Sequence, residues 1–163
     1  MTSTAFHLST FMPYRLAVLS ERVSRRLSVE YEKTFGLSVA EWRVLVHLSR
    51  CGAVSVREIH NCVNLEKPRV SRAVSRLRDA GFVQKMPGED DGRLVAISLT
   101  DKGASTLAAI LPAARAIDAR LRAVVSAAEL KAFCNVLERM HAVLDDDPDA
   151  KPRSRMDLEG LDI

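Results

Sequence analysis

The sequence has no long apolar run. No stretch reaches the roughly 18 uninterrupted apolar residues that a membrane span requires, and the N-terminus shows neither a charged leader nor an apolar signal segment. The chain has 163 residues, of which 47% are apolar and 28% are charged, a composition typical of one packed domain. We therefore expect a soluble, cytoplasmic protein with no membrane partner.

Cysteines are few, and their number is odd. Cys51, Cys62 and Cys134 show no C-x-x-C spacing, which argues against a disulfide framework and against a zinc site. We expect them to be small, reduced core residues. The four histidines are dispersed, and the sequence contains neither a glycine-rich phosphate loop nor a nucleophile elbow. An enzyme is therefore the least favoured class, and the sequence predicts neither a metal nor a cofactor.

The net charge is only +3, but it is unevenly distributed. Residues 66–78 carry five basic residues against one acid, whereas residues 145–163 carry seven acids against three bases. A concentrated basic segment is typical of a protein that binds a polyanion. The acidic end also contains Pro148, Pro152 and Gly160, so we expect residues 146–163 to form a disordered tail.

Three copies of the capping box Ser-x-x-Glu indicate where helices begin. They occur at Ser38–Glu41, Ser55–Glu58 and Ser126–Glu129. In each copy, the serine and glutamate side chains can satisfy N–H groups that the first helical turn leaves unpaired. Apolar residues spaced by three or four predict two more long helices, from Pro13 to Gly36 and from Thr100 towards Val125, the second bent at its proline.

Only residues 82–99 show the alternation typical of strands. The segments Phe82–Met86 and Val95–Leu99 flank a polar stretch rich in turn-forming residues. This pattern predicts a hairpin with a long polar tip. We therefore expect a mainly α fold with a small β-hairpin wing.

Residues 66–80, wound onto a helix, separate into an apolar face and a cationic face. A short helix over residues 56–62 lies just upstream, and the pair forms a helix-turn-helix. The second helix of such a unit fits the roughly 12 Å wide major groove of DNA, where arginine can bind guanine or neutralise phosphate. The sequence does not tell which arginine does which. The DNA-contacting residues that we expect here are Lys67, Pro68, Arg69, Ser71, Arg72, Ser75 and Arg76.

Five segments occur in a characteristic order: LSVAEWRVLVHL (37–48), VSVREI (54–59), VSRAVSRLRDAGFV (70–83), DGR (91–93) and ISLTDKG (97–103). Together they resemble the winged helix-turn-helix of the MarR family of bacterial transcriptional regulators. The resemblance implies a homodimer, with residues 8–36 and 101–145 as the helical dimerisation region and residues 37–100 as the DNA-binding lobe. It also places Asp91 and Arg93 in the wing, with Arg93 entering the minor groove. The family often has a second arginine where this chain has Gly92.

The same resemblance implies a regulated input. Family members commonly bind small organic anions between the dimer helices and the DNA-binding lobe, so we expect a repressor of a pseudo-palindromic operator that such an effector releases. The segments PYRLAVLSERVSR (13–25) and EWRVL (41–45) resemble members that act in aromatic-compound catabolism, which suggests an aromatic acid or its coenzyme A thioester. The candidate ligand-binding residues are Tyr14, Arg15, Trp42, Arg43 and His47.

Plainer roles stay open for several of these residues. Trp42 is also suited to the core, and Arg43 is also suited to a salt bridge. His47 can equally be a histidine that is hydrogen-bonded within the protein or exposed to solvent. The alternative function is a winged-helix module that binds proteins and no specific DNA. The cationic outer face of residues 69–76 disfavours it, because protein interfaces centre on buried apolar anchors.

Overall fold

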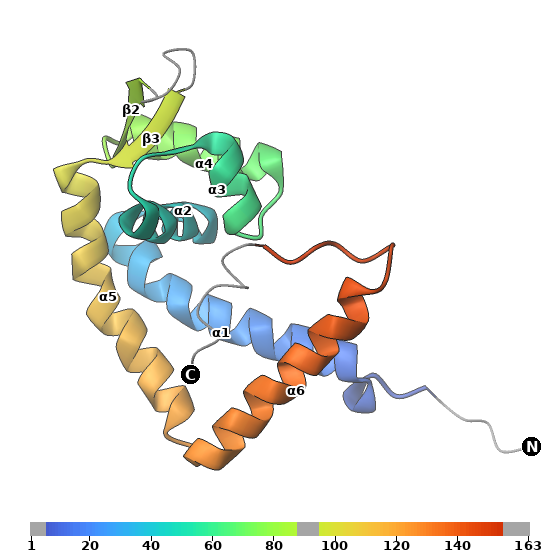
Figure 1. Cartoon of the computed structure of the whole chain (residues 1–163). Coiled ribbons are helices and arrows are strands. Elements are labelled where there is room, and N and C mark those ends of the chain that lie inside the picture. The colour runs from blue at the N-terminus through green and yellow to red at the C-terminus, as the bar shows by residue number, and fades with distance from the viewer. Residues whose placement is uncertain (1–5, 88–94, 155–163) are drawn as a thin grey trace, which may run out of the picture.

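The computed structural model describes residues 6–87 and 95–154, in which a lobe of shorter helices and a small sheet is joined to three long helices (Figure 1). The mainly α architecture with a hairpin wing confirms the expected fold class. The helices are η1 (Leu8–Thr10), α1 (Met12–Phe35), α2 (Val39–Cys51), α3 (Val56–Cys62), α4 (Lys67–Asp79), α5 (Asp101–Arg122) and α6 (Ala127–Asp145), and the strands are β1 (Val54–Ser55), β2 (Val83–Pro87) and β3 (Val95–Leu99).

Each predicted Ser-x-x-Glu box begins a helix. At Ser38 and Ser126 the box is complete, with the serine side chain accepting from the glutamate N–H and the glutamate side chain accepting from the serine N–H. At Ser55 the hydroxyl accepts from the N–H of Glu58. At the other end of a helix, Gly36 closes α1 with a φ of 66°, a left-handed conformation that glycine adopts readily.

The sheet has three antiparallel strands in the order β1-β3-β2. The predicted hairpin is confirmed, with Val83 opposite Leu99 and Pro87 opposite Val95. The expectation of a single hairpin was incomplete, because β1 adds a third strand through the pairs Val54–Ile97 and Ser55–Ala96. The hairpin tip, which carries the wing residues Asp91 and Arg93, lies outside the described residues.

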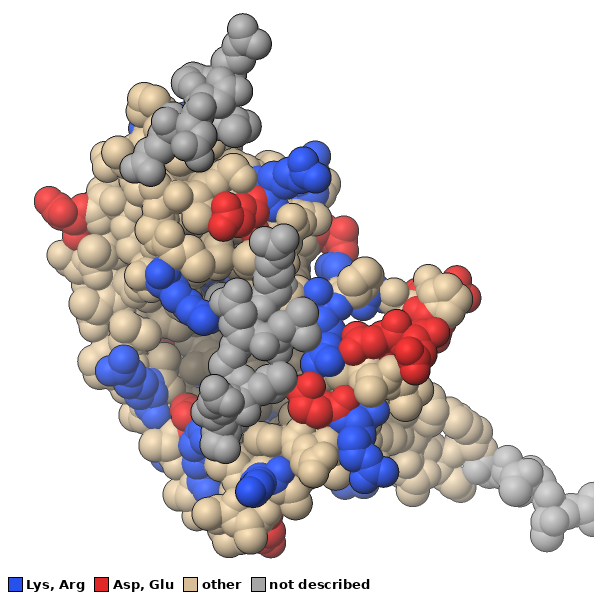
Figure 2. All heavy atoms as spheres, in the orientation of Figure 1, with Lys and Arg blue, Asp and Glu red and all other residues tan. Residues whose placement is uncertain are grey.

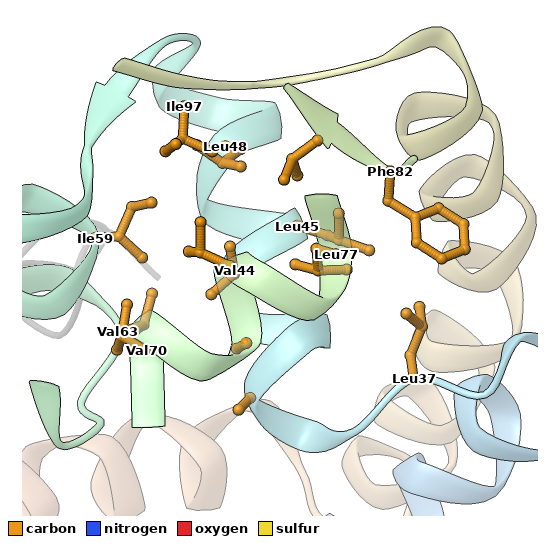
Figure 3. Packing of buried hydrophobic residues seen from close by; sticks show 14 of the residues in the cluster. Leu37, Val44, Leu45, Leu48, Ile59, Val63, Val70, Leu77, Phe82 and Ile97 are labelled. Atoms are coloured by element: carbon orange, nitrogen blue, oxygen red, sulfur yellow. The ribbon is translucent and has the colours of Figure 1, made fainter. Parts of the chain in front are cut away.

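One apolar core joins the helices of the lobe to the sheet. Leu45 and Leu48 of α2, Ile59 of α3, Leu77 of α4 and Ile97 of β3 are each almost fully buried and point into it (Figure 3). Burial of a large aliphatic side chain contributes about 1.5–3 kcal/mol. This core therefore fixes the orientation of α4 relative to α2 and α3.

The segment Thr100–Gly103 joins the lobe to α5. The Thr100 hydroxyl donates to the Gly81 carbonyl at 2.7 Å and accepts from the Gly103 N–H at 3.1 Å. Lys102 Nζ donates to the Ala80 carbonyl at 2.7 Å, at the C-terminal end of α4, where a cation also suits the helix dipole. These contacts fix the start of α5 against the end of α4.

The segment after α6 makes contacts that were not predicted from the sequence. Residues 146–154 have no helix or strand, yet Arg153 pairs with Glu138 and Asp145 of α6 at 2.8 and 2.9 Å, and Lys151 pairs with Glu66 at 3.3 Å. Acidic side chains gather over the C-terminal end of α6 (Figure 2), where they attract Arg153 back to the helix. The composition of the tail gave no sign of this contact.

The cysteines were expected in the core, and this is wrong for one of them. Cys62 is buried and Cys134 is half-buried, but Cys51, in the last turn of α2, is exposed. Among the described residues, no helix is long and apolar enough to cross a membrane.

Candidate nucleic-acid interface

Helix α4 has one buried face and one exposed cationic face. Val70, Ala73, Val74 and Leu77 are buried in the core. All seven residues expected to contact DNA, from Lys67 to Arg76, are exposed. Pro68 lies in the first turn, where its missing N–H costs no intrahelical hydrogen bond. The helix can therefore present its arginines to a ligand without losing its packing.

Arg76 is oriented by a residue that the sequence analysis treated only as a helix cap. Its Nε lies 3.6 Å from Oε1 of Glu41, a side chain that is 6% exposed, while Arg76 itself stays 76% exposed. The other carboxylate oxygen of Glu41, Oε2, accepts the N–H of Ser38 at 2.6 Å. One buried carboxylate thus caps α2 and also holds an arginine of α4 beside the start of α2.

A groove of about 770 Å³ runs between the N-terminal end of α2 and the exposed face of α4. Its lining is Ser38, Ala40, Glu41, Arg69, Ser71, Arg72, Ala73, Ser75 and Arg76. Five of the predicted DNA-contacting residues meet here. Glu41, the one acid in this lining, is 6% exposed and pairs with Arg76. Arginines and hydroxyls along a groove suit a phosphate backbone and base edges.

The turn between α3 and α4 sets the start of α4. Asn64 adopts a φ of 49°, a left-handed conformation that asparagine tolerates better than most residues. From α2, Arg43 Nη1 donates to the carbonyls of Val63 and Asn64 at 3.4 and 3.5 Å. Arg43, expected to be a salt-bridge partner if not a ligand residue, instead contacts the backbone of this turn.

A second groove, of about 370 Å³, lies between α1 and α2. Two of the five predicted ligand-binding residues, Trp42 and Arg43, line it. Tyr31 stacks on Trp42, with ring centroids 5.3 Å apart and planes within 7°. Burial raises the pKa of Tyr31, and the positive charge of Arg43 opposes that shift. The remaining lining consists of Leu16, Leu19, Ser20, Val23, Ser24, Leu27, Tyr31 and Val39.

The other three predicted ligand-binding residues do not line this groove. Tyr14 and Arg15 are exposed near the start of α1. His47 is buried on α2, and its Nδ1 lies 3.8 Å from the sulfur of Cys51. The α1 wall was not predicted, because the apolar stripe on that helix indicates packing as readily as a ligand site.

Within residues 6–87 and 95–154, no three His, Cys, Asp or Glu side chains gather closely enough to hold a metal ion.

Residues 35–94 match the model of the MarR family. This segment runs from the end of α1 through α2, α3 and α4 into the wing, and so contains the whole helix-turn-helix. Over this segment the chain is similar to the MarR family of regulators. The family match thus includes the cationic groove, but of the second groove it includes only the α2 side.

Individual relatives extend this likeness. The chain is 37% identical to YwoH of Bacillus subtilis, an HTH-type transcriptional regulator, over 71 residues, or 44% of this chain and about half, 52%, of that relative. It is 28% identical over 131 residues to the HTH-type transcriptional repressor Rv2887 of Mycobacterium tuberculosis, which covers 80% of this chain and 91% of that one.

Solved structures share the fold of this chain. The structure of BpsR from Bordetella bronchiseptica, which concerns regulation of its DNA binding by 6-hydroxynicotinic acid, superposes with a TM-score of 0.74. The superposition covers 83% of this chain and 96% of BpsR at 21% identity. At that identity the likeness shows the arrangement of the long helices and the lobe, and nothing about the ligand.

Proposed function

We propose that this protein is a homodimeric repressor of the MarR family that binds a pseudo-palindromic DNA site and is released from it by a small organic acid. The observation that carries the proposal is the geometry of α4. Its apolar face is fixed in the core of the lobe, and Arg69, Arg72 and Arg76 are exposed along one groove. A helix held in this way fits the major groove of duplex DNA.

The two halves of the interface have different tasks. Arg69 and Arg72 lie in the first turns of α4, the part of a recognition helix that contacts base edges. Arg76, held near Glu41 at the rim of α2, is better placed for phosphate. Arg93 in the wing would enter the minor groove, and Asp91 would steady a nearby arginine. This wing role is supported only by the sequence.

Exposed apolar residues on the long helices support a homodimer. No residue of α6 is buried in the single chain, although Phe133 and Val136 form an apolar edge along it. Amphipathic helices are stabilised mainly by packing of that apolar face. A two-fold dimer through the regions 8–36 and 101–145 would place two copies of α4 in successive major grooves, roughly 34 Å apart.

The groove between α1 and α2 supports an aromatic acid as effector. The stacked rings of Trp42 and Tyr31 and the leucines of α1 offer apolar walls, and Arg43 offers a cation for a carboxylate. BpsR, which shares the fold, is regulated by such an acid. A coenzyme A thioester would have to extend out of the groove. Trp42 and Arg43 are the candidates that we retain.

The recognition role of α4 is tested by comparing Arg72→Ala with Arg78→Ala. Both remove one arginine from α4, but Arg78 lies in the last turn and pairs with Asp79 at 2.9 Å. We expect Arg72→Ala to weaken binding about tenfold or more, since a good arginine contact to a base contributes about 1–3 kcal/mol of discrimination. Arg78→Ala should stay within about twofold of wild type.

The measurement is fluorescence anisotropy with a duplex that the wild type selects from a random pool, repeated at several salt concentrations. The affinity should fall by about 0.9 log units per log unit of salt for each phosphate contacted. If the wild type selects no sequence, the protein is the alternative, a winged-helix module without specific DNA binding. If Arg72→Ala keeps full affinity and selectivity, α4 is not the recognition helix.

A further inference from the structure

Arg43 contacts both the second groove and the helix-turn-helix. It is half-buried on α2 and forms part of the wall of the groove between α1 and α2. Its Nη1 also donates to the carbonyls of Val63 and Asn64, in the turn that precedes α4. One guanidinium thus lies between the candidate effector site and the start of the candidate recognition helix.

The turn that Arg43 contacts is conformationally demanding. Asn64 adopts its left-handed φ of 49° between Val63 and Leu65, which are both buried. The N-cap residue of α4, Glu66, makes no side-chain capping hydrogen bond. A residue in this region of φ costs free energy that the surroundings must offset. The two hydrogen bonds from Arg43 are part of those surroundings.

These hydrogen bonds are long, at 3.4 and 3.5 Å, and their acceptors are neutral. A carboxylate binds arginine through two parallel, charge-assisted hydrogen bonds, which are roughly twice as strong as neutral ones. A carboxylate in the groove therefore competes well with the two carbonyls for the same planar group. The competition depends on the anionic charge, and an uncharged ligand of the same shape does not exert it.

We infer that Arg43 is a positioning residue for α4, and that an anion bound in the groove between α1 and α2 weakens DNA binding by drawing the Arg43 guanidinium away from the carbonyls of Val63 and Asn64. The inference rests on the proposed function, because it specifies how that groove regulates that helix. Arg69 lies only a few residues beyond the turn. A change at Val63 and Asn64 therefore displaces the first helical turn of α4. DNA binds more tightly to the form in which Arg43 still contacts the two carbonyls.

An anion built into the protein tests this without an identified effector. Val23 lines the groove from α1 and is half-buried. Val23→Glu places a carboxylate there, and Val23→Gln is its uncharged match in size. With the duplex that the wild type selects, we expect Val23→Glu to bind about tenfold more weakly than Val23→Gln. In an Arg43→Met background the two should agree within about twofold.

Hydrogen exchange of the amides of Arg69 and Val70, which donate to the Glu66 carbonyl at the start of α4, gives a second readout that needs no DNA. Exchange should be faster in Val23→Glu than in Val23→Gln, and faster in Arg43→Met than in wild type. Arg57→Met, which removes an exposed arginine from α3, should leave it unchanged. If Val23→Glu does not fold, the pair Ser24→Glu and Ser24→Gln on the same wall replaces it.

The outcomes separate the two proposals. Equal DNA affinity for the glutamate and glutamine variants, or a difference that persists in the Arg43→Met background, overturns the role of Arg43 and leaves DNA recognition intact. Failure of the wild type to select any DNA refutes the proposed function. In that case, unchanged exchange of the Arg69 and Val70 amides in Arg43→Met would separately refute the proposal that Arg43 stabilises the turn.

Discussion

At the scale of single residues, Gly103 of α5 lies close to the backbone of Phe82, just before β2. A Cβ built on it would lie 2.1 Å from the carbonyl oxygen of Phe82, which is a backbone atom and not the end of a movable side chain. Gly103 lies inside α5, where glycine is otherwise a poor choice. The contact explains why the helix that connects the lobe to the long helices has glycine at this position.

Gly103→Ala therefore tests packing against helix propensity. Propensity alone predicts a gain of about 1 kcal/mol on replacing glycine by alanine in a helix. The collision with Phe82 predicts the opposite, a loss of about 1–3 kcal/mol, since the backbone must shift. Chemical unfolding monitored by circular dichroism measures the sign. Ser105→Ala, at an exposed position of the same turn, is the control and should be neutral or slightly stabilising; a more stable Gly103→Ala would contradict the observed packing.

At the scale of elements, the same capping box occurs in two different surroundings. At the start of α2, the Ser38–Glu41 hydrogen bonds are partly buried and Glu41 also approaches Arg76. At the start of α6, the Ser126–Glu129 hydrogen bonds are exposed, and they hold the pKa of Glu129 below its usual range. A buried polar group left without a partner costs more than an exposed one, because water cannot replace the lost partner.

We expect Ser38→Ala to lower the free energy of unfolding by about 1–2 kcal/mol. Ser126→Ala removes the same cap from an exposed helix end and should cost less. Both variants are compared by urea unfolding at one protein concentration, so that self-association affects them equally. If Ser126→Ala is the more damaging, then α6 contributes more to the cooperative unit than its exposure in the single chain indicates.

The sequence predicted most elements because each has a local signal. The serine boxes marked three helix starts, Gly36 marked the end of α1, and the apolar spacing of α4 correctly predicted its buried face. Strand β1 escaped because two residues cannot show an alternation, and because Ser55 is also the N-cap of α3. Local signals thus give the elements, and a short strand depends on a partner that is distant in the sequence.

The candidate sites were predictable to unequal degrees for a related reason. The cationic face of α4 follows from helical periodicity alone, so all its predicted residues share one exposed side. The pairing of Arg76 with Glu41, and the contact of Arg43 with the turn at Asn64, join residues that are far apart in the chain. No spacing rule contains such contacts, because they depend on how α2 packs against α3 and α4.

At the scale of the whole molecule, the long helices leave apolar surface without a partner in the single chain. Helices α5 and α6 meet at a sharp corner away from the lobe (Figure 1), and Leu121, Val124 and Val125 are exposed there. Phe133, Val136, Val143 and Leu144 continue this surface along α6. Contiguous exposed apolar side chains on a protein of this size are typical of an interface. A stable dimer needs about 1,000 Å² or more of buried surface.

If the proposed dimer forms through this surface, replacing Phe133 and Val136 together by glutamate should separate it. The two side chains are 48% and 41% exposed in the single chain and lie one helical turn apart, so charges there meet the partner and not the lobe. Lys131→Glu, at an exposed position on the other side of α6, changes the net charge by the same amount and is the control. Sedimentation equilibrium at micromolar concentration should give a dimer for the wild type and for the control, and a monomer for the double variant.

The monomer should also bind a two-half-site duplex far more weakly, because two linked recognition helices gain affinity through their high effective concentration. A double variant that stays dimeric would place the interface elsewhere, and a monomeric wild type would remove the basis for a pseudo-palindromic site.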